Sequence, residues 1–213
     1  MVERNDPIAA QIAEILSERI VSGELPPGAP LRQDHVAREF GASHVPAREA
    51  FQMLSALGLA VSEPRRGMRV APLDASSVRE VVEMRGALEP LALRYAAQRM
   101  TQVRFAKIEE AMAAGEKAAT LRDWEAANRD FHKALVEPCR MPRLLAALEQ
   151  LRLASSRIVL ATMRSTDWQP RSNLDHGRIV EAVRRKEFEQ AASLLKAHIE
   201  GMERTGLRLD QKP

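Results

Sequence analysis

The sequence predicts a mainly α-helical protein with two domains: three helices and a short β-hairpin, followed by a six-helix antiparallel bundle. Apolar residues recur at helical spacing over most of the chain, which is typical of amphipathic helices. That spacing is lost after Gly58, where short apolar runs flank a turn. No convincing strand follows Asp74. We therefore assign 1–72 to the first domain, 73–76 to a linker and 77–213 to the bundle.

Composition excludes several classes of protein. The 213 residues are 45% hydrophobic and 29% charged, which is typical of a globular chain that buries a core. No apolar run approaches the roughly 20 residues that cross a bilayer, and the first residues lack the apolar segment of a secretory signal. Cys139 is the single cysteine, which excludes an internal disulfide and suits a reducing compartment. We therefore expect a cytoplasmic protein without membrane contact.

The net charge does not by itself indicate nucleic-acid binding. The isoelectric point of about 9.3 is basic, but residues 1–72 hold eight arginines, no lysine and nine acidic residues. Only the local placement of arginines can therefore indicate a DNA surface. Aromatic residues make up 4% of the chain, which gives little support to base-stacking platforms for single strands.

Capping and turn residues bound the first three helices. Asp6 and Pro7 are suited to the cap and the first position of a helix. A second, short helix is expected over about 33–40. Ser43 is then suited to cap a third helix that reaches about Leu57.

A hairpin is expected after these helices. Two strand candidates, 59–61 and 68–70, flank a turn that contains Pro64 and Gly67. Two small helices joined by a short turn, followed by a hairpin with basic residues at its tip, form the outline of a winged helix-turn-helix.

The third helix predicts a surface that reads duplex DNA. The face opposite its apolar stripe carries residues three and four positions apart, which can enter a major groove together. Arg48 can bond a guanine edge in two places, and Ser43 at the helix start is suited to a phosphate oxygen. A solvated helix face and a surface hairpin are the alternative reading. The expected DNA contacts are Ser43, His44, Val45, Arg48 and Gln52 on the helix, and Arg65, Arg66 and Gly67 at the wing tip.

These segments resemble the winged-helix domain of GntR-type bacterial transcriptional regulators. The resemblance rests on 25–31 (LPPGAPL), 36–43 (VAREFGAS), 45–51 (VPAREAF), 57–59 (LGL) and 65–73 (RRGMRVAPL). It implies binding of double-stranded operator DNA as a homodimer. His44 stands where arginine is common in the family, Val45 where threonine is common, and Asp34 where some members are basic.

The remainder of the chain predicts a helical bundle with short connections. Its first helix is long, with an apolar face expected at Val78, Val81, Val82, Leu88, Leu91 and Tyr95. Further helices are expected over about 102–120, 123–136, 142–163, 173–185 and 187–205.

Three histidines lie on three separate predicted helices of this bundle. His132, His176 and His198 stand at helical spacing from apolar residues, so each is expected to face inward. A buried imidazole needs a polar partner, and for one histidine alone a nearby carbonyl or carboxylate suffices. For all three together we favour one divalent metal ion, with the side-chain oxygen of Asn128 as a fourth ligand and other positions open to water or an anion.

Residues 77–205 resemble the FCD ligand-binding domain of the FadR subfamily, in its shorter VanR-like branch. The resemblance rests on 84–90 (MRGALEP), 128–135 (NRDFHKAL), 141–144 (MPRL), 176–183 (HGRIVEAV) and 197–200 (AHIE). It implies a divalent metal ion, of the Zn, Ni or Mn class, at His132, His176, His198 and position 128. Asn128 replaces the family's acidic residue there, which leaves the site more positive by one charge.

The resemblance also implies a small carboxylate or sugar acid as effector. Arg85 lies where the family often places an arginine in the pocket, so a carboxylate can be held between it and the metal. The alternative is a helical Arg85–Glu89 pair. Arg152 and Arg157 are weaker candidates for contact with the effector, and we favour a surface role for both.

These expectations combine into a homodimeric DNA-binding transcriptional regulator, favoured as a repressor, whose operator affinity follows a carboxylate bound at the metal. One alternative is a regulator that senses the metal itself. Another is a metal-dependent hydrolase, but no glutamate stands beside these histidines at the spacing of a general base, as in His-Glu-x-x-His. We therefore expect no enzyme activity.

Overall fold

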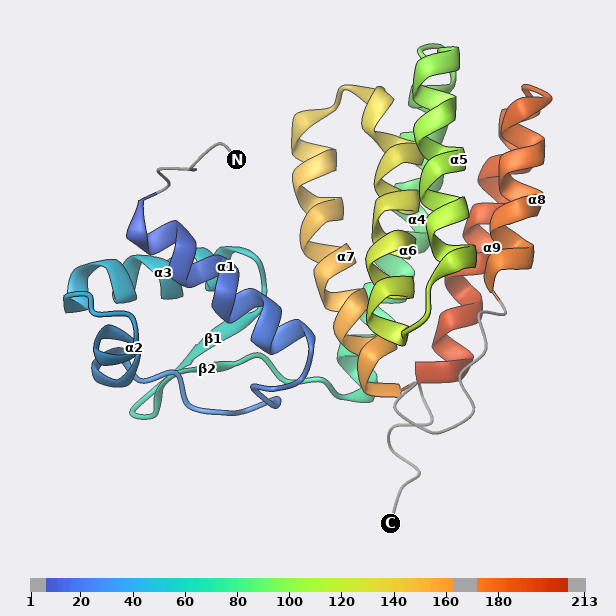
Figure 1. The fold of residues 1–213 in the computed structure, drawn as a ribbon. Helices are drawn as coiled ribbons and strands as arrows, with labels where there is room; N and C mark the ends of the chain where they lie inside the picture. The colour runs from blue at the N-terminus through green and yellow to red at the C-terminus, as the bar shows by residue number, and fades with distance from the viewer. Residues whose placement is uncertain (1–6, 163–171, 207–213) are drawn as a thin grey trace. The chain divides into compact units, whose positions relative to one another are not determined.

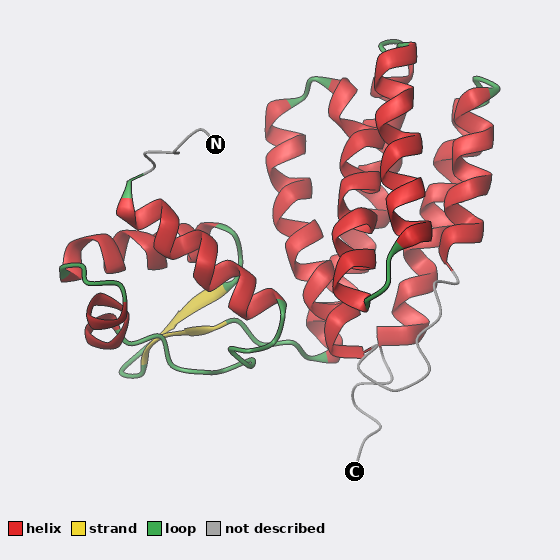
Figure 2. Ribbon diagram, in the orientation of Figure 1, coloured by secondary structure: helices red, strands yellow, loops and turns green. Residues whose placement is uncertain are grey.

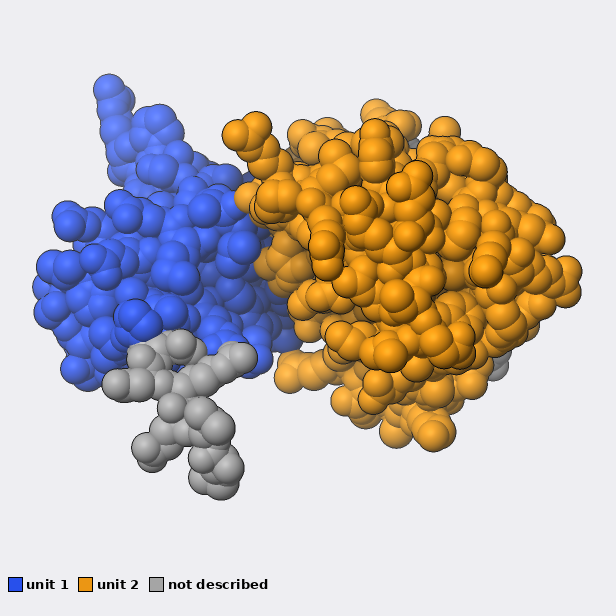
Figure 3. Space-filling view, turned by 90° about the horizontal axis from the view of Figure 1, so that it is seen from above, with its two compact units in different colours: residues 1–73 blue, residues 74–213 orange. Residues whose placement is uncertain are grey.

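The computed structural model describes residues 7–162 and 172–206 (Figure 1). The described residues form nine α-helices, one short 3₁₀ helix and one two-stranded sheet, which confirms the mainly helical fold class (Figure 2). The chain divides into two compact units, residues 1–73 and residues 74–213 (Figure 3).

The first unit packs one helix across another. Its elements are α1 (Ile8–Val21), α2 (Gln33–Glu39), α3 (His44–Ala56), β1 (Ala60–Glu63) and β2 (Gly67–Val70). Ile12 and Leu16 of α1 and Phe51 and Leu54 of α3 are fully buried where these helices meet. The cap of α1 is Pro7, not Asp6 as predicted, and Asp6 lies outside the described residues.

The hairpin after α3 is a wing with a three-residue tip. Strands β1 and β2 are antiparallel, with Ala60 opposite Val70 and Glu63 opposite Gly67. Arg65 at the tip has a φ of 63° and Gly67 a φ of 76°, so both adopt the left-handed backbone that a tight turn requires. The segment before α2 adds to the wing, because the Leu31 N–H donates to the Met68 carbonyl at 2.9 Å.

The second unit contains all six predicted helices. They are α4 (Ala75–Ala97), α5 (Gln102–Lys117), α6 (Leu121–Val136), α7 (Pro142–Thr162), α8 (Ser172–Arg184) and α9 (Phe188–Gly206), with the 3₁₀ helix η1 (Glu137–Cys139) after α6. The predicted linker 73–76 is too long. Asp74 accepts hydrogen bonds from the Ser77 N–H at 2.8 Å and the Ser76 hydroxyl at 2.7 Å, and this cap starts α4 at Ala75.

Helix α4 places two charged residues on its buried face and several apolar residues on its exposed face. Arg85 and Glu89 are buried between Val82 and Leu93. By contrast, Leu91 and Tyr95, which we predicted to face inward, are 38% and 50% exposed, and so is Met84 at 40%. The prediction was wrong because it took apolar side chains as the marker of the inner face. A buried ion pair instead occupies two turns of that face.

Candidate DNA-binding surface and metal centre

The predicted recognition residues all lie on the surface of the first unit. Ser43, His44, Val45, Arg48 and Gln52 are exposed, as are Arg65, Arg66 and Gly67 at the wing tip. Ser43 occupies the cap position of α3, but its hydroxyl makes no capping hydrogen bond within the described residues. The hydroxyl therefore remains able to donate to a phosphate oxygen.

The charged side chains on this surface differ in whether an oppositely charged side chain lies close to them. Within the part of the chain that the structure describes, no ion pair holds the Arg48 guanidinium. His44 lies close to an acid, with its Nδ1 3.3 Å from Asp34 Oδ1. At the wing, Arg66 lies 3.5 Å from Glu63. On α3, no acid competes with a base edge for Arg48, whereas Asp34 brings negative charge to the recognition face.

The bundle brings the three predicted histidines together. They come from different helices: His132 from α6, His176 from α8 and His198 from α9. One ring nitrogen of each lies within 4.8 Å of the corresponding atom of the other two. The Nε2 atoms of His176 and His198 are 3.2 Å apart, and Phe131 stacks on the His176 ring at 4.1 Å.

A buried carboxylate fixes the orientation of His132. Glu89 is fully buried, and its Oε2 lies 2.7 Å from His132 Nδ1 while its Oε1 accepts from Arg85 Nε at 2.7 Å. Burial opposes the ionisation of Glu89, but the charge of Arg85 and these hydrogen bonds outweigh it and hold its pKa well below the usual value. The ionised carboxylate makes His132 the donor at Nδ1, so its Nε2 carries the lone pair.

Burial favours the neutral form of all three imidazoles, which is the form that binds a metal. Burial and the neighbouring His198 lower the pKa of His176 to about 2. Burial and His132 lower the pKa of His198 to about 3. Burial also lowers the pKa of His132, against the effect of Glu89.

The donor set fits a divalent ion. His132 Nε2 is buried and has no hydrogen-bond partner among the described residues. Two nitrogens bound at 2.0–2.1 Å to one tetrahedral ion lie about 3.3 Å apart, which is close to the 3.2 Å between His176 and His198. These residues offer three lone pairs to one point.

Asn128 lies one turn before His132 and is held by a second buried acid. Its Nδ2 donates to Glu125 Oε2 at 3.0 Å, and the Ser156 hydroxyl donates to Glu125 Oε1 at 2.6 Å. This contact uses the amide nitrogen, so the amide oxygen is the atom of Asn128 that can coordinate an ion. Burial raises the pKa of Glu125 although both hydrogen bonds oppose the rise.

The arginines near the site are more buried than we predicted. Arg85 is 2% exposed and donates to Ser155 as well as Glu89, so the helical pair that we left open is present. Arg152 and Arg157, expected at the surface, are 4% and 5% exposed. The spacing of Arg152 indicates its burial, because it follows the buried Leu148 by four positions on α7 and so lies on the same face of that helix.

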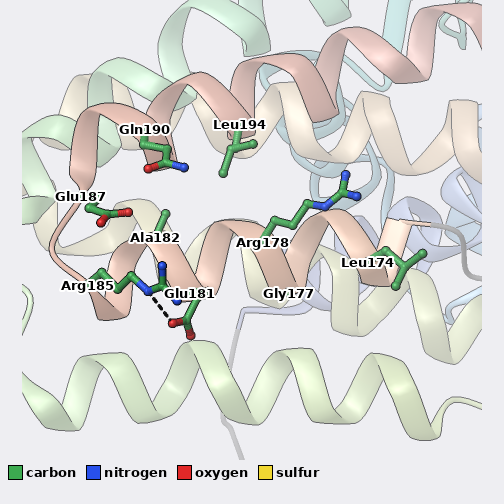
Figure 4. Close-up of a pocket in the computed structure, with 9 residues that line it drawn as sticks. All are labelled: Leu174, Gly177, Arg178, Glu181, Ala182, Arg185, Glu187, Gln190 and Leu194. Atoms are coloured by element: carbon green, nitrogen blue, oxygen red, sulfur yellow. Dashed lines mark hydrogen bonds and ion pairs between the residues drawn. The ribbon is translucent and has the colours of Figure 1, made fainter.

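A separate surface groove of about 470 Å³ lies between α8 and α9 (Figure 4). Leu174, Ala182 and Leu194 contribute apolar lining, and Arg185 at its rim pairs with Glu181 at 2.7 Å. None of the three histidines lines it. Because its charges neutralise one another, this groove offers no excess charge to an anion.

Comparison with known proteins identifies the chain. Residues 8–70 match the gntR family of bacterial regulatory proteins, and residues 80–201 match the FCD domain. A protein of Paenarthrobacter nicotinovorans described as a probable D-xylose utilization operon transcriptional repressor is 33% identical over 90% of this chain and 85% of its own. The chain belongs to the GntR family and carries an FCD domain.

Other similarities agree with this GntR–FCD assignment. The galactonate operon transcriptional repressor of Escherichia coli K12 is 29% identical over 85% of this chain and 89% of its own. The Escherichia coli protein McbR/YncC has the same fold, with a TM-score of 0.81 at 21% identity over 97% of this chain and 100% of that one. GntR–FCD proteins are transcriptional regulators, so this chain is a regulator and not an enzyme.

Sequence reasoning missed three residues of the GntR–FCD site. Glu89 was considered only as the helical partner of Arg85, but it also binds His132. Glu125 and Ser156 were not considered at all, although they bind each other inside the bundle.

The described helices include none long and apolar enough to span a membrane.

Proposed function

We propose that this protein is a homodimeric repressor whose operator affinity is set by a small carboxylate or sugar acid bound at a metal centre in the FCD unit. Relatives named as repressors of D-xylose and galactonate operons support the sign of regulation and the sugar-related effector class. A protein that binds operator DNA in a bacterium works in the cytoplasm.

One observation carries the metal centre: His132 Nε2 is buried without a partner and lies beside His176 and His198. The three histidines hold the ion, and Asn128 Oδ1 is the fourth ligand. Imidazole ligands suit zinc and nickel, and an amide oxygen also suits manganese. When bound, the ion supplies a positive charge that attracts an anionic oxygen. No catalytic base accompanies it in this proposal.

The effector controls DNA binding only if it binds the DNA-competent and incompetent states with different affinity. Helix α4 connects effector binding with DNA binding, because it begins directly after the winged unit and carries Arg85 and Glu89 into the histidine centre. A ligand that shifts α4 therefore acts on the segment that leads to the DNA-binding unit.

The exposed face of α4 supports dimerisation. Its apolar positions are Met84, Ala87, Leu88 and Leu91, of which Leu88 is half-buried and the others exposed. Their spacing is the same in both directions along the helix, so two antiparallel copies of α4 bring Met84 of one against Leu91 of the other. A two-fold interface needs such a self-complementary surface.

Polar side chains flank this apolar stripe. Arg79, Glu80 and Glu83 are exposed towards the start of α4, and Arg94, which pairs with Glu189 at 2.8 Å, and Tyr95 are exposed towards its end. Antiparallel pairing therefore surrounds the stripe with a polar rim, as is typical of protein interfaces. We therefore propose a second copy of this chain as the partner of this face.

Metal analysis and DNA binding together test the regulatory site. We expect protein purified without chelator to hold one divalent ion per chain, and His176→Ala to lose it. The variant His35→Ala, at an exposed histidine of the first unit, is the matched control and keeps the ion. Full metal content in His176→Ala would return the three histidines to a structural role.

Fluorescence anisotropy then separates effector control from metal sensing. We measure the affinity for a duplex selected from a random library, with and without zinc and D-galactonate. Release by galactonate only in the zinc-loaded protein supports the proposal. Release that follows zinc alone identifies a metal sensor.

Sedimentation tests the dimer. We expect Leu91→Glu to produce monomers, because it places a carboxylate against the apolar Met84 of the other copy in the proposed interface. Val103→Glu, at an exposed apolar residue of α5, is the control and stays dimeric. An unchanged dimer in Leu91→Glu excludes this face.

A further inference from the structure

Two polar atoms in the described part of the FCD unit are buried without a partner: His132 Nε2 and Arg152 Nη1. Native proteins rarely leave buried donors and acceptors unsatisfied, and exceptions often mark the place of a missing ion or ligand. The histidine nitrogen is accounted for by the metal. The arginine nitrogen is a donor, so a metal cannot satisfy it, and it needs an acceptor.

Arg152 is anchored on one side only. Its Nη2 donates to Glu149 Oε2 at 2.7 Å, and Glu149 is 45% exposed, so this contact holds the guanidinium from the solvent side. Nη1 is left inside the bundle. Arg152 lies one turn before Ser156 on α7, and Ser156 donates to Glu125, whose other oxygen accepts from Asn128 on the helix of His132. Arg152 is thus on the part of α7 that packs against this helix.

The buried acids Glu89 and Glu125 do not pair with Arg152, whose ionic partner Glu149 is half exposed. Glu89 is committed to Arg85 and His132. Glu125 accepts from Ser156 and Asn128. A divalent ion at the histidines adds further positive charge. An anion beside Arg152 Nη1 gives this buried donor its acceptor and offsets the charge of the ion.

We propose that Arg152 is the second anchor of the effector: its Nη1 binds a carboxylate of a small ligand whose other oxygen atoms face the histidine centre. This inference rests on the proposed function and deepens it. It replaces Arg85 as the carboxylate anchor, because the Arg85 guanidinium already donates to Glu89 and Ser155. The ligand class is a small acid with a carboxylate at one end and hydroxyl or carboxylate oxygens at the other.

Acetate, the simplest carboxylate, is the probe. In the zinc-loaded full-length protein we measure the melting temperature against sodium acetate, with sodium chloride at equal ionic strength as reference. We expect the wild type to be stabilised by acetate. Arg152→Met should require about tenfold more acetate or higher, since a charge-assisted hydrogen bond is lost.

The melting temperatures of the variants without acetate show whether Arg152 is a ligand anchor or a structural residue. Without acetate, Arg152→Met should melt at or above the wild-type temperature, because it removes a buried donor that has no partner. The matched control Arg143→Met, at an exposed arginine of the same helix, should respond to acetate as the wild type does.

Each outcome decides the matter. If Arg152→Met binds zinc and responds to acetate as the wild type does, Arg152 is not the anchor, but the proposed function is not contradicted. A ligand-free Arg152→Met that melts well below the wild type makes the residue structural and also overturns it. A wild type that binds no zinc contradicts the proposed function itself, and zinc binding without any acetate response contradicts the anion site.

Discussion

Replacing Glu89 by glutamine tests the buried network from which the metal centre is built. The carboxylate is fully buried and accepts from Arg85 Nε and His132 Nδ1, each at 2.7 Å. Glu89→Gln keeps the shape but removes the charge, so Arg85 becomes an uncompensated buried cation. Breaking a buried ion pair on one side costs about 3–5 kcal/mol of unfolding free energy.

The same substitution weakens metal binding for a different reason. An amide is a poorer acceptor than a carboxylate, so it holds the His132 ring and tautomer less firmly. Loss of such a partner behind a ligating histidine costs about 10- to 100-fold in metal affinity. Urea unfolding of the metal-free protein measures the first effect, and competition with a chromophoric zinc chelator measures the second.

A double variant separates the two effects. Arg85→Met added to Glu89→Gln removes the unpaired cation, so it should recover most of the lost unfolding free energy without restoring zinc affinity. Glu116→Gln, at an exposed acid of α5, is the control and should change neither quantity. If Glu89→Gln stays within about 1 kcal/mol of wild type and binds zinc equally well, the network has no role in either.

Three further predictions concern the DNA surface and the pH dependence. Arg48→Ala should weaken binding to a selected duplex by about 1–3 kcal/mol in anisotropy titrations; equal affinity would exclude α3 as the recognition helix in the assigned orientation. Asp34→Asn should strengthen binding several-fold at low salt and less at high salt, because it removes a negative charge close to His44 on the recognition face; a weaker complex would mean that Asp34 orients His44 for contact. Metal-free protein should lose stability as the pH falls below about 6.5, because the unfolded chain then binds protons that His176 and His198, with pKa values lowered to about 2 and about 3, do not. The loss approaches about 1.4 kcal/mol per pH unit for each histidine. The variant His176→Gln removes one such histidine, so it should reduce the slope of unfolding free energy against pH between pH 6 and 5 by about that amount.

The fold was predictable because each helix carries its own boundary signals. Thr101 and Thr120 cap α5 and α6, and both were close to the expected helix starts. The winged unit was readable from turn residues such as Gly58 and Gly67, whose positive φ values match the turns they were expected to form. These signals are local, so a single sequence displays them.

The second layer of the site was harder to predict, because its polar residues are buried in place of apolar ones. Arg152 and Glu125 stand on inner faces of their helices, where a periodicity argument expects hydrophobic side chains. Their burial depends on partners from elsewhere in the bundle, as Ser156 of α7 is for Glu125 of α6. Such pairings are long-range, and spacing along one helix does not reveal them.

Helix α4 shows why these charges are arranged as they are. In an isolated monomer, the buried Arg85–Glu89 pair on the inner face of α4 and the exposed Met84 and Leu91 on its outer face are both unfavourable. Both become favourable when the pair serves the proposed metal centre and the outer side chains meet a second copy. Glu89 directly follows the stripe residue Leu88, and Arg85 directly follows Met84. Any movement of α4 that adjusts Glu89 behind His132 therefore also moves the proposed dimer face, which gives the effector a physical route to the spacing of the two DNA-binding units.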